Sequence, residues 1–303
     1  MEQEFYSNGK LLLSSEYAIL DGAQGLAIPT KYGQSLVVKS IEKPVLHWKS
    51  IAYDGTIWFE AEFAMNNYII NNTTNSEVAQ TLQKLLVEAK RQNPNFISEE
   101  KGVEAISNLT FPREWGLGSS STLINNIAQW ANVNAYHLLW NAFGGSGYDI
   151  ACAQHDFPIT YTLKNGLPQV AQAKFNPPFK DSLYFVYLNQ KQNSKKAIEA
   201  YRGQAFDRGQ LVNQLSSITQ KMIQTTSLAQ FEALIEEHEA ILSEVLGLQP
   251  VKSRLFPDYN EAIKSLGAWG GDFVLVTGSE SSIVFFREKG FETIFSYNQM
   301  IRI

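Results

Sequence analysis

The chain has 303 residues, of which 44% are hydrophobic and 18% are charged, and its formal net charge is −5. This length suits two domains with sizeable cores, and the composition excludes a disordered chain. The acidic balance argues against nucleic acid or an anionic membrane surface as the main partner. The single cysteine, Cys152, excludes an internal disulfide and a cysteine-based metal site.

The sequence contains no signal for a membrane or an export route. No apolar run approaches the length of a spanning helix, about 18 residues or more. The first five residues, Met1–Phe5, are mostly polar or acidic and lack the apolar core of a signal peptide. We therefore expect a cytoplasmic protein with no membrane partner.

Residues 5–38 are expected to form a strand, a turn and further strands. The predicted turns are Ser7–Gly9 and Asp21-Gly22, and we expect Pro29 to end a segment before a strand at Ser35–Val38. The β-type side chains of residues 44–62 then indicate a hairpin.

Two charged residues, Lys10 and Glu16, stand inside this otherwise apolar first region. One interpretation is a solvated pair at a strand edge, which would have no chemical role. The other is a lysine that meets a phosphate group and a glutamate that holds the lysine in place.

The next stretch contains clear signals for one helix and one strand. The hairpin of residues 44–62 turns at Asp54-Gly55, and a helix then begins with Ser76 as its cap. The apolar positions of this helix recur at helical spacing and predict a packing face. They are Val78, Leu82, Leu85, Leu86 and Ala89. A strand is expected at Val103–Leu109.

A glycine- and serine-rich loop, Trp115–Thr122, precedes an apolar helix that extends to Ala131. Its two glycines allow positive φ angles and close approach of a ligand to the backbone. A helix that starts there would direct unpaired N–H groups and the positive end of its dipole at one point, which is typical of a phosphate site. The alternative is an ordinary loop that caps a core helix.

A second glycine-rich turn, Phe143–Gly147, leads into Tyr148, Asp149 and a helix of small residues. Asp149 is either an N-cap residue or a general base held close to the phosphate loop. A strand at Ile159–Leu163 and a turn at Asn165-Gly166 follow.

After a break at Asn176–Pro178, we expect a strand at Tyr184–Leu188 and two long helices, one from Ser194 and one from Ser227. His238, on the apolar face of the second helix, is interpreted as a histidine at the edge of the core.

The last motif, Gly267–Asp272, is expected between a helix from Tyr259 and a strand Phe273–Val276, with another strand at Ser282–Phe286. Its glycines indicate unusual backbone angles or close approach to a ligand. Trp269 in this loop is either a wall of a substrate site or a core residue.

Taken together and in this order, three stretches resemble the motifs of the GHMP kinase superfamily. They are Lys10–Tyr17, the phosphate loop at Pro112–Ser121, and Gly267–Asp272. Within the superfamily, Gly145–Asp149 is similar to phosphomevalonate kinases, whereas Ser15-Glu16-Tyr17 is similar to mevalonate kinases. The resemblance therefore leaves the branch open.

The resemblance implies an α+β fold of two domains. The first, residues 1–167, would be the N-terminal α/β domain, similar to domain 2 of ribosomal protein S5, and would carry the phosphate loop. The second, residues 168–303, would be ferredoxin-like. It also implies an ATP-dependent kinase that uses Mg²⁺ and a small-molecule substrate, in the mevalonate pathway of isoprenoid biosynthesis. A homodimer is left open.

The resemblance also implies roles for individual residues. Asp149 would take the proton from a substrate hydroxyl, and Lys10 would stabilise the developing charge. ATP would be bound by the loop, with Ser120 as the Mg²⁺ ligand; the loop residues are Gly116, Leu117, Gly118, Ser119, Ser120 and Ser121. The implied substrate-binding residues are Glu16, Tyr17, Ser146, Gly147, Gly270, Gly271 and Asp272.

The chain departs from the family pattern at several positions. Leu138 stands where mevalonate kinases have a glutamate that helps to hold Mg²⁺, and Trp269 stands where the family prefers glycine. Two alternatives to a kinase therefore stay open. One is a non-catalytic metabolite or nucleotide sensor on the same fold, and the other is a diphosphomevalonate decarboxylase.

Overall fold

A computed structural model describes residues 2–98, 101–190, 194–269 and 271–302. The chain divides into two compact units, each assembled from separate stretches of sequence. Unit 1 comprises residues 1–9, 32–113 and 117–154, and unit 2 comprises residues 10–31, 114–116 and 155–303. The domain boundary after residue 167 stays a prediction.

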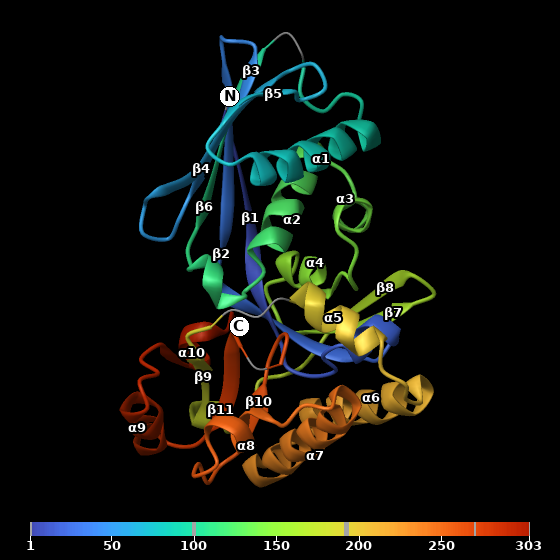
Figure 1. The fold of residues 1–303 in the computed structure, drawn as a ribbon, viewed down its shortest axis with the longest axis vertical. Coiled ribbons are helices and arrows are strands. Elements are labelled where there is room, and N and C mark those ends of the chain that lie inside the picture. Colours follow the sequence, from blue (N-terminus) through green and yellow to red (C-terminus); the bar gives the residue numbers. More distant parts are fainter. Residues whose placement is uncertain (1, 99–100, 191–193, 270, 303) are drawn as a thin grey trace. The chain divides into compact units, whose positions relative to one another are not determined.

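Unit 1 is a sheet with helices packed on it (Figure 1). The strands within it follow the order β5-β4-β3-β6-β2, and β1 pairs with β2. Along this order β3 and β6 pair in parallel, whereas β5 with β4, β4 with β3 and β6 with β2 pair antiparallel. The strands are β1 (Glu2–Leu12), β2 (Gly25–Ile41), β3 (Val45–Ile51), β4 (Ile57–Ala64), β5 (Ile70–Thr73) and β6 (Gly102–Leu109), and of these the end of β1 and the beginning of β2 belong to unit 2.

Four helices of unit 1 pack against one another and share one apolar core with the sheet. They are α1 (Ser76–Gln92), α2 (Ser119–Ala131), α3 (Ala135–Ala142) and α4 (Tyr148–Ala153). The apolar stripe predicted for the first of them is confirmed, because Leu82, Leu85 and Leu86 are buried. Burial of this stripe is the main source of helix stability, since propensity alone leaves a helix of this length marginal.

Unit 2 contains a four-stranded antiparallel sheet with the order β10-β11-β9-β12. Along the chain its elements alternate as strand, helices, strand, strand, helix and strand, which is the ferredoxin-like arrangement predicted for the C-terminal part. The strands are β9 (Leu183–Tyr187), β10 (Ile263–Ser265), β11 (Phe273–Thr277) and β12 (Ile294–Ser296).

The helices of unit 2 are α5 (Ser194–Arg202), α6 (Arg208–Gln224), α7 (Leu228–Leu246), α8 (Val251–Leu255), α9 (Glu280–Glu288) and α10 (Tyr297–Met300). A hairpin of β7 (Ile159–Lys164) and β8 (Leu167–Gln172) pairs with the beginning of β2. Short 3₁₀ helices are η1 (Ala18–Asp21), η2 (Arg113–Trp115) and η3 (Lys180–Ser182). None of the helices in the described residues has both the length and the apolar character needed to span a bilayer.

Two expectations for the first 38 residues are wrong. Ser7–Gly9 is not a turn but part of β1, and Pro29 does not end a strand but lies inside β2. The proline is tolerated because β2 pairs with β7 over Gly25–Ala27 and with β6 only from Gln34 onward. Its missing N–H therefore falls between the two ladders.

Two helix assignments in the sequence also need correction. The N-cap of α1 is Asn75, whose side chain accepts from the Val78 N–H, and Ser76 is the first helical residue. Between the predicted helices near Ser194 and Ser227 the structure contains a third, α6, whose polar surface conceals a buried stripe of Leu211, Leu215 and Ile218.

Near the C-terminus, Ser282–Phe286 is helical and not a strand. Its β-branched and aromatic residues suggested a strand, but Ser279 and Ser282 form a capping box that begins α9. The helix expected from Tyr259 does not form, since residues 259–262, all of them described, are not helical. Instead Ile263–Ser265 forms strand β10, so the Gly267–Asp272 loop connects two antiparallel strands.

Candidate active site

The site residues predicted from the sequence divide between the two units. Unit 1 contains Leu117, Gly118, Ser119, Ser120, Ser121, Ser146, Gly147 and Asp149. Unit 2 contains Lys10, Glu16, Tyr17, Gly116, Gly271 and Asp272. Gly270 lies outside the described residues.

The glycine- and serine-rich loop leads into α2 in unit 1, as the sequence predicted. Gly118 is the N-cap in a left-handed conformation, with φ of 89°, and as a glycine it has no side chain with which to cap the first turn. Leu117 is fully buried beside it, Ser121 is buried, and Ser120 is exposed. A helix that begins at a glycine has no N-cap side chain over its first N–H groups, and such a helix start is suited to bind an anion.

Asp149 lies in the first turn of α4, which begins after Gly147 in a left-handed conformation. The alternative that Asp149 is the N-cap residue is therefore wrong, since Gly147 occupies that position. Helix α4 packs against α2, and Gln154 Nε2 donates to Asn125 Oδ1 at 3.0 Å. The helix that carries Asp149 is thus fixed to the helix that follows the phosphate loop.

The donors available for a metal ion are few. Leu138 is fully buried in the core of unit 1, so α3 presents no ligand at that position. No cluster of three or more His, Cys, Asp or Glu suited to a metal is found in the part of the chain that the structure describes. The exposed Ser120 hydroxyl still suits Mg²⁺, which keeps several waters and is commonly held through substrate phosphates.

In unit 2, Lys10, Gly116 and Asp272 come together from distant parts of the sequence. Lys10 Nζ donates to the Gly116 carbonyl oxygen at 3.1 Å. Gly116 has φ of 67°, and a Cβ added there would lie 2.5 Å from the Asp272 carboxylate. Only glycine therefore fits at position 116, where the backbone approaches a carboxylate that is 8% exposed.

Trp115 fixes the peptide that precedes Gly116. Its ring packs against Tyr187, Phe273 and Phe295, with centroid distances of 6.4, 5.8 and 5.2 Å. The Tyr187 hydroxyl also donates to the Glu114 carbonyl oxygen at 3.2 Å. These contacts hold residues 114–116 on the sheet of unit 2, and the sequence motif alone gave no sign of them.

Glu16 is 1% exposed and belongs to a buried cluster of charges. Lys264 Nζ donates to Glu16 Oε1 at 2.6 Å, to Glu239 Oε1 at 3.1 Å and to the Ser265 carbonyl oxygen at 2.7 Å. The interpretation of Glu16 as part of a solvated pair is wrong, because Glu16 is buried, and its expected role in holding Lys10 stays a prediction. The cation that Glu16 binds is Lys264.

Burial and, to a smaller extent, nearby Glu239 raise the pKa of Glu16 to about 7 against the opposing effect of Lys264. Burial also disfavours the Lys264 ammonium, but Glu16 and Glu239 outweigh this and raise the pKa of Lys264. A cluster of two carboxylates and one ammonium has an excess negative charge, so retaining a proton on Glu16 relieves it.

The backbone around Glu16 is strained and is held by side chains of α6 and α7. Ser15 and Tyr17 both have positive φ, 65° and 61°, which is uncommon for residues other than glycine. The Ser15 N–H donates to His238 Nε2 at 2.9 Å, and Ser14 and Thr219 share a hydrogen bond at 2.7 Å. His238 is therefore a fully buried residue that accepts a hydrogen bond, and burial lowers its pKa.

We expect stability to depend on pH through Glu16. The folded protein retains the Glu16 proton up to a pKa of about 7, whereas the ordinary value is 4.5. Between these two pKa values the folded state therefore binds more protons than the unfolded state. The stability that this proton contributes is fully present at low pH and is lost as pH rises through about 7. Urea unfolding from pH 5 to pH 8 should show wild type losing stability relative to Glu16→Gln. Parallel curves for the two proteins would contradict this assignment.

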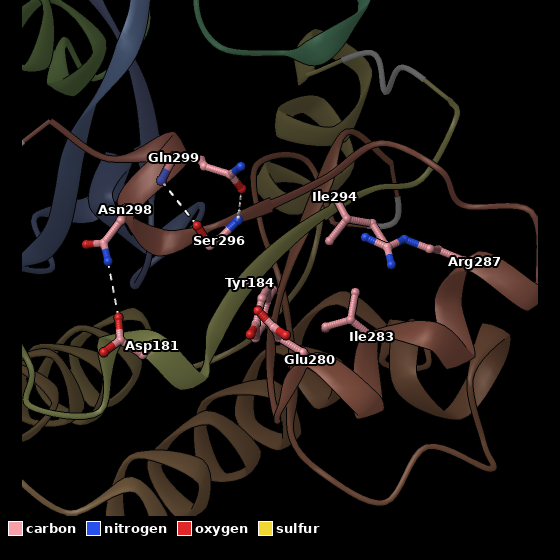
Figure 2. Close-up of a pocket in the computed structure, with 9 residues that line it drawn as sticks. All are labelled: Asp181, Tyr184, Glu280, Ile283, Arg287, Ile294, Ser296, Asn298 and Gln299. Carbon is pink, nitrogen blue, oxygen red and sulfur yellow. Dashed lines mark hydrogen bonds between the residues drawn. The ribbon is translucent and has the colours of Figure 1, made fainter.

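Figure 2 shows an open pocket of unit 2, with a volume of about 680 Å³, between α9, β9, β12 and α10. It is lined by Asp181, Tyr184, Glu280, Ile283, Arg287, Ile294, Ser296, Asn298 and Gln299. Asn298 Nδ2 donates to Asp181 Oδ1 across one side at 3.1 Å. None of the predicted site residues lines this pocket, so we do not place the chemistry there.

The sequence reasoning missed Lys264, Glu239 and Trp115. A lone lysine within the apolar segment Ala262–Leu266 was a signal for Lys264, because a charge in a buried strand requires a partner. No comparable signal marked Glu239, which follows the exposed Glu236 and Glu237 on α7.

The fold matches solved structures over almost the whole chain. Methanococcus jannaschii mevalonate kinase matches with a TM-score of 0.69 and 13% identity, covering 100% of this chain and 99% of that one. Streptococcus pneumoniae phosphomevalonate kinase in complex with phosphomevalonate and AMPPNP matches with a TM-score of 0.69 and 13% identity, covering 97% and 99%. Staphylococcus aureus mevalonate diphosphate decarboxylase gives 0.60 and 12%, covering 99% and 94%.

No protein-family model matches the sequence, and no curated protein does. The structural neighbours nevertheless agree with one another, since they are all members of one superfamily. The resemblance drawn from the sequence motifs is confirmed at the level of fold. The protein has the fold of the GHMP kinase superfamily.

Proposed function

We propose that the protein is an ATP-dependent phosphotransferase that transfers the γ-phosphate of ATP to a small-molecule hydroxyl or phosphate acceptor of the mevalonate pathway. The observation that carries the proposal is the phosphate loop itself. In a chain with the GHMP kinase fold, α2 begins at a left-handed glycine, which places no N-cap side chain over the first N–H groups of the helix. The neighbour solved with AMPPNP and phosphomevalonate supports ATP as the donor.

The proposed chemistry is an in-line displacement at the γ-phosphorus. A bond forms from the acceptor oxygen to phosphorus, and the bond from phosphorus to the β-bridging oxygen breaks and releases ADP. With an alcohol acceptor, Asp149 takes the hydroxyl proton. Lys10 supplies a positive charge where negative charge develops, and such preorganised charges are a large part of phosphoryl-transfer catalysis.

The loop residues have the supporting role. The backbone N–H groups of Gly118, Ser119 and Ser120 would bind the β- and γ-phosphates, because they belong to the uncapped start of α2. Ser120 would hold Mg²⁺, which when bound neutralises phosphate charge. As substrate-binding residues we propose Tyr17, Ser146, Gly147 and Asp272. Glu16 is buried, so it would act on the substrate site only through its neighbours.

The substrate itself is tested with a panel of acceptors. Wild-type protein with ATP and Mg²⁺ is offered mevalonate, phosphomevalonate, homoserine and sugars, and products are identified by mass spectrometry. We expect ADP and one phosphorylated acceptor in equal amounts. Nucleotide binding without transfer to any acceptor would favour the sensor, for which the buried Leu138 is the motivating observation. Release of carbon dioxide from diphosphomevalonate would favour the decarboxylase.

A further inference from the structure

The buried charge cluster of unit 2 joins two segments that the sequence motifs assign to the substrate site. Glu16 belongs to the Lys10–Tyr17 segment, and Lys264 belongs to β10, which leads directly into the Gly267–Asp272 loop. The two side chains lie 248 positions apart in the sequence and meet at 2.6 Å, with neither exposed to solvent beyond 1%.

The Lys264 ammonium has three N–H donors, and each has an acceptor. Glu16, Glu239 and the Ser265 carbonyl oxygen take one each. Glu239 is held from its other oxygen, because the Ser265 hydroxyl donates to Glu239 Oε2 at 2.6 Å. When all three donors of a buried ammonium are bound to fixed acceptors, the ammonium can occupy only one position. It then fixes the distance between the elements that supply those acceptors.

Strained backbone lies on both sides of this ion pair. Ser15 and Tyr17 flank Glu16 with positive φ, and Trp269 and Asp272 have φ of 54° and 57° in the loop after β10. Such conformations persist only where the surrounding structure over-determines them, and they gather at functional sites. Within unit 2, both segments reach the corner where the Asp272 carboxylate lies against Gly116, whose carbonyl oxygen accepts from Lys10.

We propose that Lys264 is a positioning residue of the candidate site, whose ammonium ties Glu16 to the strand that leads into the Gly267–Asp272 loop while Glu239 of α7 holds it from the other side. Lys264 touches no reacting atom. It acts by fixing where Tyr17 and Asp272 stand within unit 2. This inference rests on the proposed function for its catalytic consequence, but its structural consequence can be measured without turnover.

The groups that face Glu16 are Lys264 of β10 and Glu239 and His238 of α7. His238 accepts the Ser15 N–H and its pKa is lowered, so it contributes no positive charge at neutral pH. The charge of Glu16 is therefore governed by its burial, and among the charged groups by Lys264 and Glu239. This makes Glu239→Gln a matched control: its amide oxygen can accept from Lys264, and its NH₂ group can donate to the Ser265 hydroxyl.

The test compares Lys264→Met with Glu239→Gln by hydrogen exchange and mass spectrometry. In Lys264→Met we expect amide exchange in both the Lys10–Tyr17 segment and the loop around Asp272 to rise about tenfold or more, whereas Glu239→Gln stays within about threefold of wild type. If amides in the loop around Asp272 exchange at the same rate in Lys264→Met as in wild type, the proposal is overturned.

The catalytic arm uses the acceptor identified by the panel. We expect kcat/KM to fall about 100-fold in Lys264→Met, since a misplacement of about 1 Å has this effect. Glu239→Gln removes a negative charge that raises the pKa of Glu16, so this pKa should fall. The part of the pH dependence of kcat/KM that reports the ionisation of Glu16 should therefore move to lower pH. An unmoved profile together with normal kcat/KM in Lys264→Met would contradict a positioning role.

The outcomes separate the two proposals. If wild type transfers phosphate to no acceptor, the proposed function fails, and the exchange comparison still decides the role of Lys264. If Lys264→Met does not fold, the variant with Lys264→Met, Glu16→Gln and Glu239→Gln removes every charge of the cluster and leaves none unpaired. This triple variant should fold and still show faster amide exchange than wild type in the Lys10–Tyr17 segment and in the loop around Asp272. Exchange at the wild-type rate in these segments would overturn the inference.

Discussion

Replacing Asp149 by asparagine is expected to lower kcat with an alcohol acceptor by a factor of about 10² to 10⁴, the usual contribution of a general base. Asparagine keeps the shape of the side chain but cannot take the hydroxyl proton. Stability should change little, because Asp149 is partly exposed and the N-cap of α4 is Gly147. The loss of a carboxylate from the first turn costs about 1 kcal/mol or less.

The measurement is steady-state kinetics of wild type, Asp149→Asn and a control, Asp258→Asn, which changes an exposed aspartate outside the predicted site. The same variant also separates the two acceptor classes. A phosphate acceptor presents an oxygen that is already anionic, so loss of a base should matter much less for it. Wild-type turnover by Asp149→Asn with an alcohol acceptor would remove Asp149 from the chemistry.

Replacing Gly116 by alanine is expected to lower both the stability of the protein and its activity. Two costs combine there. Alanine at φ of 67° is strained by about 1 kcal/mol. The new Cβ would also lie 2.5 Å from the Asp272 carboxylate, and relieving such overpacking costs about 1–3 kcal/mol more. Because the Gly116 carbonyl binds Lys10, we also expect kcat/KM to fall.

Gly247→Ala is the matched control for backbone strain, since Gly247 has φ of 64° and nothing within 4 Å of an added Cβ. The free energies of unfolding of both variants are measured in urea. The double variant Gly116→Ala with Asp272→Ala should regain stability relative to Gly116→Ala, as expected for residues in contact. Equal losses in Gly116→Ala and Gly247→Ala would show that the carboxylate does not crowd position 116.

Local sequence patterns predicted the elements whose stability is decided locally. The hairpin around Asp54-Gly55, helix α1 and the start of α2 follow from turn residues, apolar spacing and a glycine-containing loop. The prediction failed where a helix cap together with tertiary burial outweighed the β-type composition of a segment. Residues 282–286 have a strand-like composition, but a capping box and burial of Ile283 and Phe286 make them helical.

The candidate site was predicted in part. The motifs identified Lys10, Gly116 and Asp272, which the structure brings together in unit 2, and the helix start that follows Gly118 in unit 1. They did not reveal that the partner of Glu16 is Lys264, because a pairing over 248 positions leaves no local pattern. Nor did they show that the side chain of Trp115 fixes the loop, since its contacts come from three separate strand segments of unit 2.

The most direct measurement of the central claim follows the γ-phosphorus of ATP. Wild-type protein is incubated with Mg²⁺, ATP labelled in its γ-phosphate and the acceptor identified by the panel. The account predicts that the label moves to the acceptor and that Asp149→Asn slows this transfer for an alcohol acceptor. Label that stays on ATP, or that appears only as inorganic phosphate, would contradict it.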